Sequence, residues 1–399
     1  MKNIIIIEKH IIIKIMTQKL NLFLVLLIVG QSLFAQQNLP IIRATSKIVD
    51  IRDGDDFKKA TWTISPNLKP DIYQTNNKNV TFYTDTDSIS FKVKPNQKYN
   101  FIILLNGKDS AYTQIVCFSS YLEILMRASK YNLDAKREIP VFTYQSFRDS
   151  NLVALRRTFN LDSIAGFGNE TSKVINLLHW VHNTVRHDGQ NESGIKNINA
   201  YSIVSTARAK NIGVSCGELA TTLNDCYLAM GWASRKIYCF PKDSLRNDHD
   251  SHVINVVFLT SKNKWIWVDP TNNAYIMDEN GDLLSIEEVR EQLIMSKPLI
   301  INPDANYRKN PVTKDYYLDT YMAKNLYRIY CPLNGEYDYE TWGLNKRVTY
   351  VYLLPLDYQI KGPYKTDDYF NPDLKTTFNN YYINNPKIFW QKPSNEAKK

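Results

Sequence analysis

One stretch of the chain, residues 213–269, constrains the fold more than any other. From Cys216 onward, apolar residues recur at helical spacing until Gly231, a residue typical of a helix end. Two runs rich in β-branched and aromatic residues follow at 252–259 and 265–269, and a short polar segment separates them. The stretch therefore predicts a helix followed by a β-hairpin.

Cys216 stands at the predicted start of that helix. A thiol at a helix N-terminus faces unpaired amides and the positive end of the helix dipole, which lowers its pKa and favours the nucleophilic thiolate. Gly217 beside it would let a substrate backbone come close. Taken alone, the pair fits a capped core cysteine about as well, so the interpretation depends on the hairpin that follows.

The hairpin supplies the two partners that a nucleophilic cysteine needs. A turn centred between Thr260 and Ser261 would place His252 directly opposite Asp269, where the carboxylate could orient the imidazole of a general base. His249, between Asp248 and Asp250, is the competing base, but its loop context predicts a solvated side chain.

These residues also carry a family resemblance. The Gly-Val-Ser-Cys-Gly helix start, Arg235 entering a strand, His-Val-Ile-Asn-Val and Trp-Val-Asp-Pro-Thr together resemble the transglutaminase-like superfamily of cysteine enzymes, in its exported multidomain bacterial form, over residues 170–290. The resemblance implies a papain-like α+β fold in which the nucleophile helix packs on an antiparallel sheet.

The resemblance also implies a role for each residue. Cys216 would be the nucleophile, His252 the general base and then acid, and Asp269 the orienting carboxylate; Trp180 would help to hold the oxyanion. The sequence departs from the commonest pattern at Cys-Gly-Glu, where an aromatic residue usually follows the cysteine, and at Asn255, where many members carry tryptophan. The family pattern implies no cofactor and no metal.

The N-terminus predicts export. Lys19, the apolar run 20–29 and Ser-Leu-Phe-Ala before Gln36 are typical of a signal peptide cleaved after Ala35, with Met16 as the true start. The run is too short to span a bilayer comfortably, so we expect a periplasmic or extracellular protein without a transmembrane anchor in its mature chain. Because export implies an oxidising compartment, the odd count of 5 cysteines leaves at least one unpaired, and spacing does not decide the rest.

Length and composition predict more than one structural unit. With 399 residues and 44% hydrophobic content, the chain can bury a sizeable core. We expect a signal peptide at 1–35, a small β domain at 36–140, a transglutaminase-like catalytic domain at 141–300 and a Tyr-rich C-terminal extension at 301–399 packed on the core. The β domain is expected from alternating runs and the turn Asn106-Gly107.

Several other segments lead to weaker expectations. Residues 170–186 have helical periodicity, and their His179 and His182 lie three apart, but no carboxylate or cysteine at a helpful spacing completes a metal site. Residues 191–210 are expected to be irregular. The net charge of +9 is not gathered into a dense basic block, which argues against nucleic-acid binding.

Two functions remain open from the sequence. The first is an enzyme that acts on amide or peptide bonds of a protein or peptide substrate, associated with the cell envelope or its glycans, through a thioester, by hydrolysis rather than crosslinking. The second is a non-catalytic binding or envelope-structural protein on the same fold.

Overall fold

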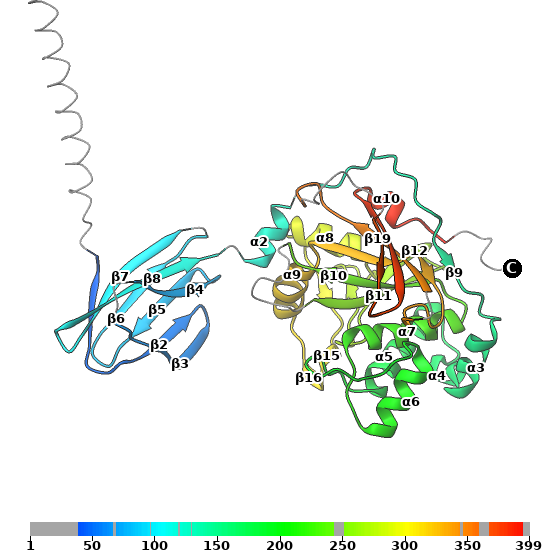
Figure 1. The fold of residues 1–399 in the computed structure, drawn as a ribbon, viewed down its shortest axis with the longest axis horizontal. Helices are drawn as coiled ribbons and strands as arrows, with labels where there is room; N and C mark the ends of the chain where they lie inside the picture. Colours follow the sequence, from blue (N-terminus) through cyan, green and yellow to red (C-terminus); the bar gives the residue numbers. More distant parts are fainter. Residues whose placement is uncertain are drawn as a thin grey trace, which may run out of the picture. The chain divides into compact units, whose positions relative to one another are not determined.

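The computed structural model describes residues 39–66, 69–95, 97–118, 120–128, 130–242, 251–343, 346–358 and 367–393. The expected signal peptide and His249 therefore lie outside the described residues. The chain divides into two compact units, Met1–Ser119 and Ser120–Lys399, which are described separately below (Figure 1).

In its described part, the first unit is a β-sandwich. Alternate residues of its strands, among them Ile51, Phe82 and Phe101, are fully buried in one apolar core between two four-stranded sheets. The sheets contain antiparallel hairpins at 79–92 and 98–117, and the second turns at the predicted Asn106-Gly107, where both residues have positive φ. In order across each sheet, the strands are β1 (Ile41–Ala44), β7 (Lys98–Leu105), β8 (Asp109–Cys117) and β4 (Asp71–Thr75), then β3 (Asp56–Thr63), β2 (Ile48–Asp53), β5 (Asn79–Tyr83) and β6 (Ser88–Lys92).

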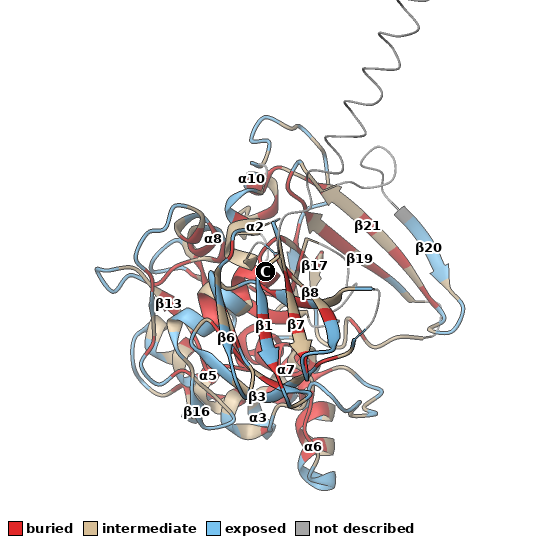
Figure 2. Cartoon of the chain, turned by 90° about the vertical axis from the view of Figure 1, so that its left-hand side faces the viewer, coloured by how far each residue is buried: buried red, intermediate tan, exposed pale blue. Residues whose placement is uncertain are grey.

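The second unit is built on a seven-stranded sheet of the described residues. Its strands run in the order β12 (Lys264–Val268), β11 (His252–Leu259), β10 (Ser234–Phe240), β17 (Arg328–Pro332), β19 (Lys346–Leu353), β21 (Thr376–Ile383) and β20 (Asp367–Asn371). Neighbouring strands are antiparallel except β19 and β21. Figure 2 shows buried residues along β19 and exposed ones on β20 at the sheet edge.

This topology corrects the prediction for residues 301–399. We predicted an extension packed on a finished core, but these residues supply β17, β19, β21 and β20 of the same sheet. Tyr350 and Tyr330 show why the composition misled: the tyrosines are ring-packed along the sheet, with centroids 5.3 Å apart, and do not form a surface cover.

A layer of helices packs against one face of the sheet. Leu177, Leu223 and Ile266 belong to the buried core between them. Residues 200–210, predicted as irregular, form a helix that Asn199 caps through Ser202, because Ile203, Val204 and Ala207 give it a buried face. The helices of this layer are α3 (Ser150–Thr158), α4 (Leu161–Ala165), α5 (Glu170–Thr184), α6 (Ala200–Lys210) and α7 (Cys216–Ala229).

A second core covers the other face and moves the predicted boundary between units. Leu125 and Phe142 are buried in this core together with Trp267. The division therefore falls after Ser119, not near residue 140. The helices on this face are α2 (Tyr121–Met126), α8 (Ile286–Ile294), the π-helix η1 (Asp315–Met322), α9 (Ala323–Asn325) and α10 (Pro386–Phe389). The described part of the unit also contains three short strand pairs: β9 (Thr143–Tyr144) with β18 (Asn334–Gly335), β13 (Ile276–Met277) with β14 (Ile300–Ile301), and β15 (Asn306–Tyr307) with β16 (Asn310–Pro311).

Within the described ranges, no helix combines the length and the apolar character needed to cross a membrane.

Candidate active site

Cys216 is the first residue of α7, as the sequence predicted. Ser215 is the N-cap: its hydroxyl accepts a hydrogen bond from the Glu218 amide at 3.2 Å, and the Glu218 carboxylate accepts one from the Ser215 amide at 2.7 Å. This reciprocal capping box fixes the first turn of the helix. The glutamate that departs from the family pattern thus holds the helix end on which the thiol sits.

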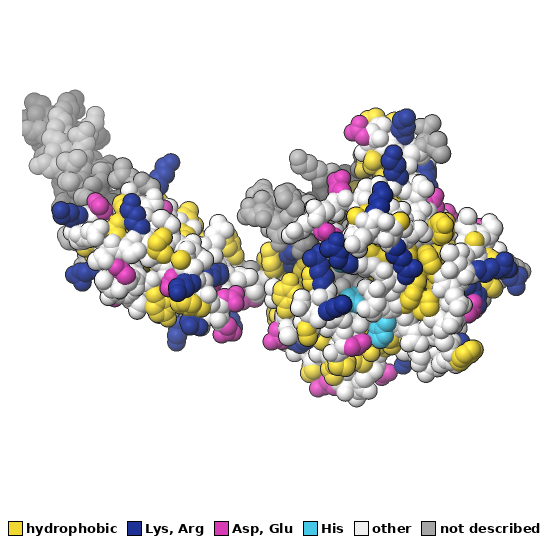
Figure 3. Space-filling view, turned by 90° about the horizontal axis from the view of Figure 1, so that it is seen from below, with side chains coloured by type: hydrophobic (Ala, Val, Ile, Leu, Met, Phe, Trp, Pro, Cys, Tyr) yellow, Lys and Arg dark blue, Asp and Glu magenta, His cyan; other side chains and the backbone are white. Residues whose placement is uncertain are grey.

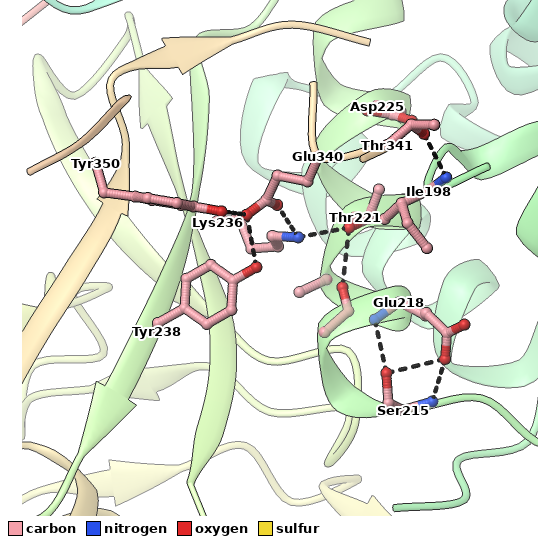
Figure 4. Close-up of polar contacts among 12 residues, drawn as sticks. Ile198, Ser215, Glu218, Thr221, Asp225, Lys236, Tyr238, Glu340, Thr341 and Tyr350 are labelled. Atoms are coloured by element: carbon pink, nitrogen blue, oxygen red, sulfur yellow. Dashed lines mark hydrogen bonds and ion pairs between the residues drawn. The ribbon is translucent and has the colours of Figure 1, made fainter. Parts of the chain in front are cut away.

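A buried polar network fastens the start of α7 to the sheet (Figure 4). Lys236 of β10 donates to the Thr221 hydroxyl at 2.8 Å and forms an ion pair with Glu340, and both partners of that pair are about 5% exposed. Glu340 also accepts hydrogen bonds from the hydroxyls of Tyr238 at 2.7 Å and Tyr350 at 2.6 Å. The charges are therefore paired and hydrogen-bonded, which is what burial of charge requires.

Asn255, the second departure from the family pattern, forms a further link between sheet and helix. Its side-chain amide donates to the carbonyl of Ala220 at 2.9 Å, and the residue is fully buried. A buried side-chain amide that donates to a carbonyl of α7 fixes the height of the helix over β11.

His252 and Asp269 are brought together, although not in the predicted register. β11 pairs Asn255 with Val268, a shift of two residues from the register that would place His252 opposite Asp269. A shift of two keeps each side chain on the same face of the sheet. The two side chains meet diagonally, and His252 Nε2 lies 2.7 Å from Asp269 Oδ2.

The Asp269 carboxylate accepts hydrogen bonds from other residues in addition to its contact with His252. One oxygen accepts from the Thr271 amide at 2.8 Å, and the other accepts from the Tyr317 hydroxyl at 2.6 Å and the Asn272 side chain at 2.9 Å. Burial alone would raise the pKa of Asp269, but the charge of His252 and these hydrogen bonds lower it to about 2. The carboxylate is therefore ionised and fixed in orientation.

No local pattern in the sequence predicts the contribution of η1 to this site. Tyr317 and Tyr321 both lie on this wide helix, and the Tyr321 ring packs edge-on against His252 with centroids 5.1 Å apart. π-helical turns occur frequently at functional sites, because they turn side chains that an α-helix would direct elsewhere.

The thiol and the imidazole are coupled. Burial would raise the pKa of Cys216, but hydrogen bonds with His187 and His252, and their charges, lower it to about 6. Burial would lower the pKa of His252, but Asp269 and then Cys216 raise it to about 10. At neutral pH the pair is therefore a thiolate and an imidazolium. Because Asp269 occupies His252 Nε2, the nitrogen left for the thiol is Nδ1.

His187 is a further residue at the thiol, and no sequence pattern predicted it there. Its Nδ1 lies 3.0 Å from the Tyr307 hydroxyl, so Nε2 is the nitrogen available to Cys216. Trp180, predicted as the oxyanion residue, lies on α5 with its ring 5.4 Å from Phe159, packed against the helical core. The structure thus places Trp180 in hydrophobic packing and His187 beside the thiol.

Two cavities lie beside Cys216. A cavity of 510 Å³ is bordered by Ser215, Gly217 and the loop 188–195. A cleft of 260 Å³ is bordered by His187 and by Leu219, which lies one turn after the thiol. A Cβ atom at Gly217 would meet Ser215 and Val253 at ordinary contact distances of 3.8 and 3.9 Å, so the fold tolerates a side chain there and the glycine keeps the approach to the thiol open.

The two histidines of α5 that were considered as metal ligands, His179 and His182, contact other residues. His182 contacts the Pro270 carbonyl and the Asn306 side chain, at 2.9 and 3.0 Å, and His179 lies 3.1 Å from Asp304. In the described part of the chain, no group of three or more His, Cys, Asp or Glu side chains could hold a metal ion. The cysteines at 117, 216, 226, 239 and 331 are all free thiols.

Comparisons with known proteins add little to this geometry. A scan against protein-family models found no match, and a search of curated proteins found no similar sequence. Among solved structures, the chain is similar to a "putative cysteine protease" from Cytophaga hutchinsonii, with 15% identity over 40% of this chain and 51% of that one, and a TM-score of 0.24. It is also similar to red sea bream transglutaminase, with 13% identity over 59% and 50%, and a TM-score of 0.22. The chain matches about half the length of each structure, and at these TM-scores the similarity carries no argument.

Proposed function

We propose that this protein is a transglutaminase-like cysteine enzyme that acts on amide or peptide bonds through a thioester at Cys216. The observation that carries the proposal is the coupling of a half-buried thiol at a helix start to a fully buried His252–Asp269 pair 2.7 Å apart. A purely structural cysteine requires neither the depressed pKa nor the oriented imidazole.

The proposed reaction follows from the positions of the atoms. The Cys216 thiolate attacks the carbonyl carbon, and the carbonyl oxygen takes the negative charge. Amides at the α7 N-terminus lack helical partners and are the backbone donors for that oxygen, and His187 adds a donor through Nε2, since Nδ1 is engaged by the Tyr307 hydroxyl. The C–N bond breaks as His252 gives its proton to the leaving amine, which leaves a thioester.

The second half of the reaction reverses the proton transfer. Neutral His252 takes a proton from water, and the hydroxide attacks the thioester carbonyl. The C–S bond breaks to give a carboxylic acid and the thiolate, and the imidazolium is restored. An amine in place of water would give crosslinking. We propose that water is the acceptor and that the reaction is hydrolysis. We propose a protein or peptide substrate of the cell envelope because the predicted signal peptide would direct the chain there.

The test is product analysis by mass spectrometry. The protein lacking residues 1–35 is incubated with a panel of peptides, with and without a primary amine. We expect the cleaved or deamidated acid as the main product in both cases, and no product from Cys216→Ala. A main product that incorporates the amine would replace hydrolysis by crosslinking. If Cys216→Ala matched the parent protein, the thioester mechanism would be excluded.

A further inference from the structure

The hairpin formed by β15 and β16 has an unusual turn. Tyr307 pairs with Asn310, so Arg308 and Lys309 form a two-residue loop with φ values of 49° and 69°. Such a turn needs positive φ at both central positions and strongly favours Asn-Gly, because glycine has no Cβ to clash there and the short polar side chain of asparagine tolerates that conformation. Arginine and lysine are both disfavoured at positive φ, yet these two long cationic residues occupy the turn.

The same hairpin is attached to the proposed active site. The Tyr307 hydroxyl contacts His187 Nδ1 at 3.0 Å, and Arg308 Nε donates to the His187 carbonyl at 2.9 Å. Asn306 contacts His182 Nε2 at 3.0 Å. The turn is therefore held beside the residue that touches the thiol.

Arg308 and Lys309 line the 260 Å³ cleft together with Arg186. The cleft is also bordered by Leu219, one turn after Cys216, and by Thr271, two residues after Asp269. No carboxylate lies among its lining residues. Asp188 lies 3.8 Å from the Arg308 guanidinium, but no carboxylate of the described residues pairs with Arg186 or Lys309. Figure 3 shows histidine side chains at the surface of the larger unit with lysine and arginine side chains gathered beside them.

The larger cavity has a lining of the opposite charge. Its lining includes Asp188, Glu192, Glu218 and Glu340 against one cation, Lys236. The fields of the two cavities therefore differ in sign, and an anionic group of a substrate would be attracted to the smaller cleft and repelled from the larger cavity.

We infer that the cleft lined by Arg186, Arg308 and Lys309 binds a carboxylate of the substrate and sets the direction in which the substrate crosses Cys216. The inference rests on the proposed function and adds the substrate class: a peptide that carries an acidic group next to the reacting amide. The strain of the Arg308-Lys309 turn then lowers the stability of the fold, and it is retained because the turn places both cations in the cleft.

The test compares two alkylating agents of similar size, anionic iodoacetate and neutral iodoacetamide, on the full mature protein. The rate ratio, iodoacetate over iodoacetamide, is measured for Cys216 by peptide mass spectrometry and divided by the ratio for free cysteine. At low salt we expect a normalised ratio of about 10, which falls as salt is added. In Arg186→Gln combined with Lys309→Gly, we expect it to fall severalfold.

The controls separate charge in the cleft from charge elsewhere. Lys210→Gln removes an exposed cation at the end of α6 and should leave the ratio unchanged. Lys309→Gly should not lower the melting temperature, because glycine adopts positive φ without strain. Peptides with Glu beside the reacting amide should be turned over faster than those with Gln, and a phosphoserine peptide distinguishes carboxylate from phosphate selectivity.

Two results would overturn the inference: a normalised ratio near 1, or an equal fall of the ratio in the cleft variant and in Lys210→Gln. A faster phosphoserine peptide would overturn the carboxylate assignment. The ratio is obtained whether or not any peptide is cleaved. Failure of the proposed function would instead appear as iodoacetamide reactivity equal to that of free cysteine, with no peptide turned over.

Discussion

Replacing His252 with glutamine is expected to lower kcat/KM by on the order of 10⁴-fold, the scale of loss seen when a general base is removed from a catalytic triad. Glutamine can still donate a hydrogen bond to Asp269, but it can neither donate a proton to the leaving amine nor carry the charge that lowers the pKa of Cys216. Alkylation of Cys216 at pH 7 should therefore slow as well. Both rates are measured on the same purified protein, together with its thermal unfolding.

The matched control for that experiment is His179→Gln. His179 lies on the same unit, at the surface of α5, and its partner Asp304 is half-exposed. We expect activity within about twofold of the parent protein, since surface substitutions away from a site change little. Equal losses of activity in the two variants, or a His252→Gln protein that retains activity, would argue against the role of His252.

The second large effect concerns stability. Lys236→Met should lower the free energy of unfolding by about 3–5 kcal/mol, because it leaves the buried Glu340 carboxylate without its cation. Chemical denaturation with a fluorescence readout measures the loss. Tyr238 and Tyr350 would still donate to the carboxylate, but two hydroxyls do not neutralise it.

The matched control here is the double variant Lys236→Met with Glu340→Gln, in which no charge remains to be compensated. We expect it to recover more than half of the lost stability. A loss below about 1 kcal/mol in Lys236→Met, or no recovery in the double variant, would show that the ion pair does not hold α7 on the sheet.

Local patterns predicted the elements that carry the reactive residues. Residues 252–259 are a strand at the predicted positions, α7 begins at Cys216, and the helix ends before Gly231, whose φ is 89°. These features depend on side-chain periodicity and on helix-end chemistry, which act over a few residues. The hairpin register was wrong by two residues, because parity along a strand fixes the face of a side chain and not its partner.

Contacts between distant segments were beyond such reasoning. Tyr317 reaches Asp269 from 48 residues away, and Glu340 reaches Tyr238 from 102. His187 lies beside the thiol only because the chain pairs it with Val214, two residues before Cys216. The C-terminal strands were predicted to be a cover on the core, because a tyrosine-rich composition indicates burial but does not indicate which sheet a strand joins.

The central claim is that Cys216 is a thiolate held by His252, and the pH dependence of its alkylation tests it most directly. The pKa of about 6 means that Cys216 is almost fully thiolate at pH 8 and that protonation reduces the thiolate fraction to one half near pH 6. We therefore predict that the rate of iodoacetamide labelling of Cys216, followed by peptide mass spectrometry, is half-maximal near pH 6. A rate that is half-maximal near 8.5, the value of an ordinary cysteine, would contradict the account.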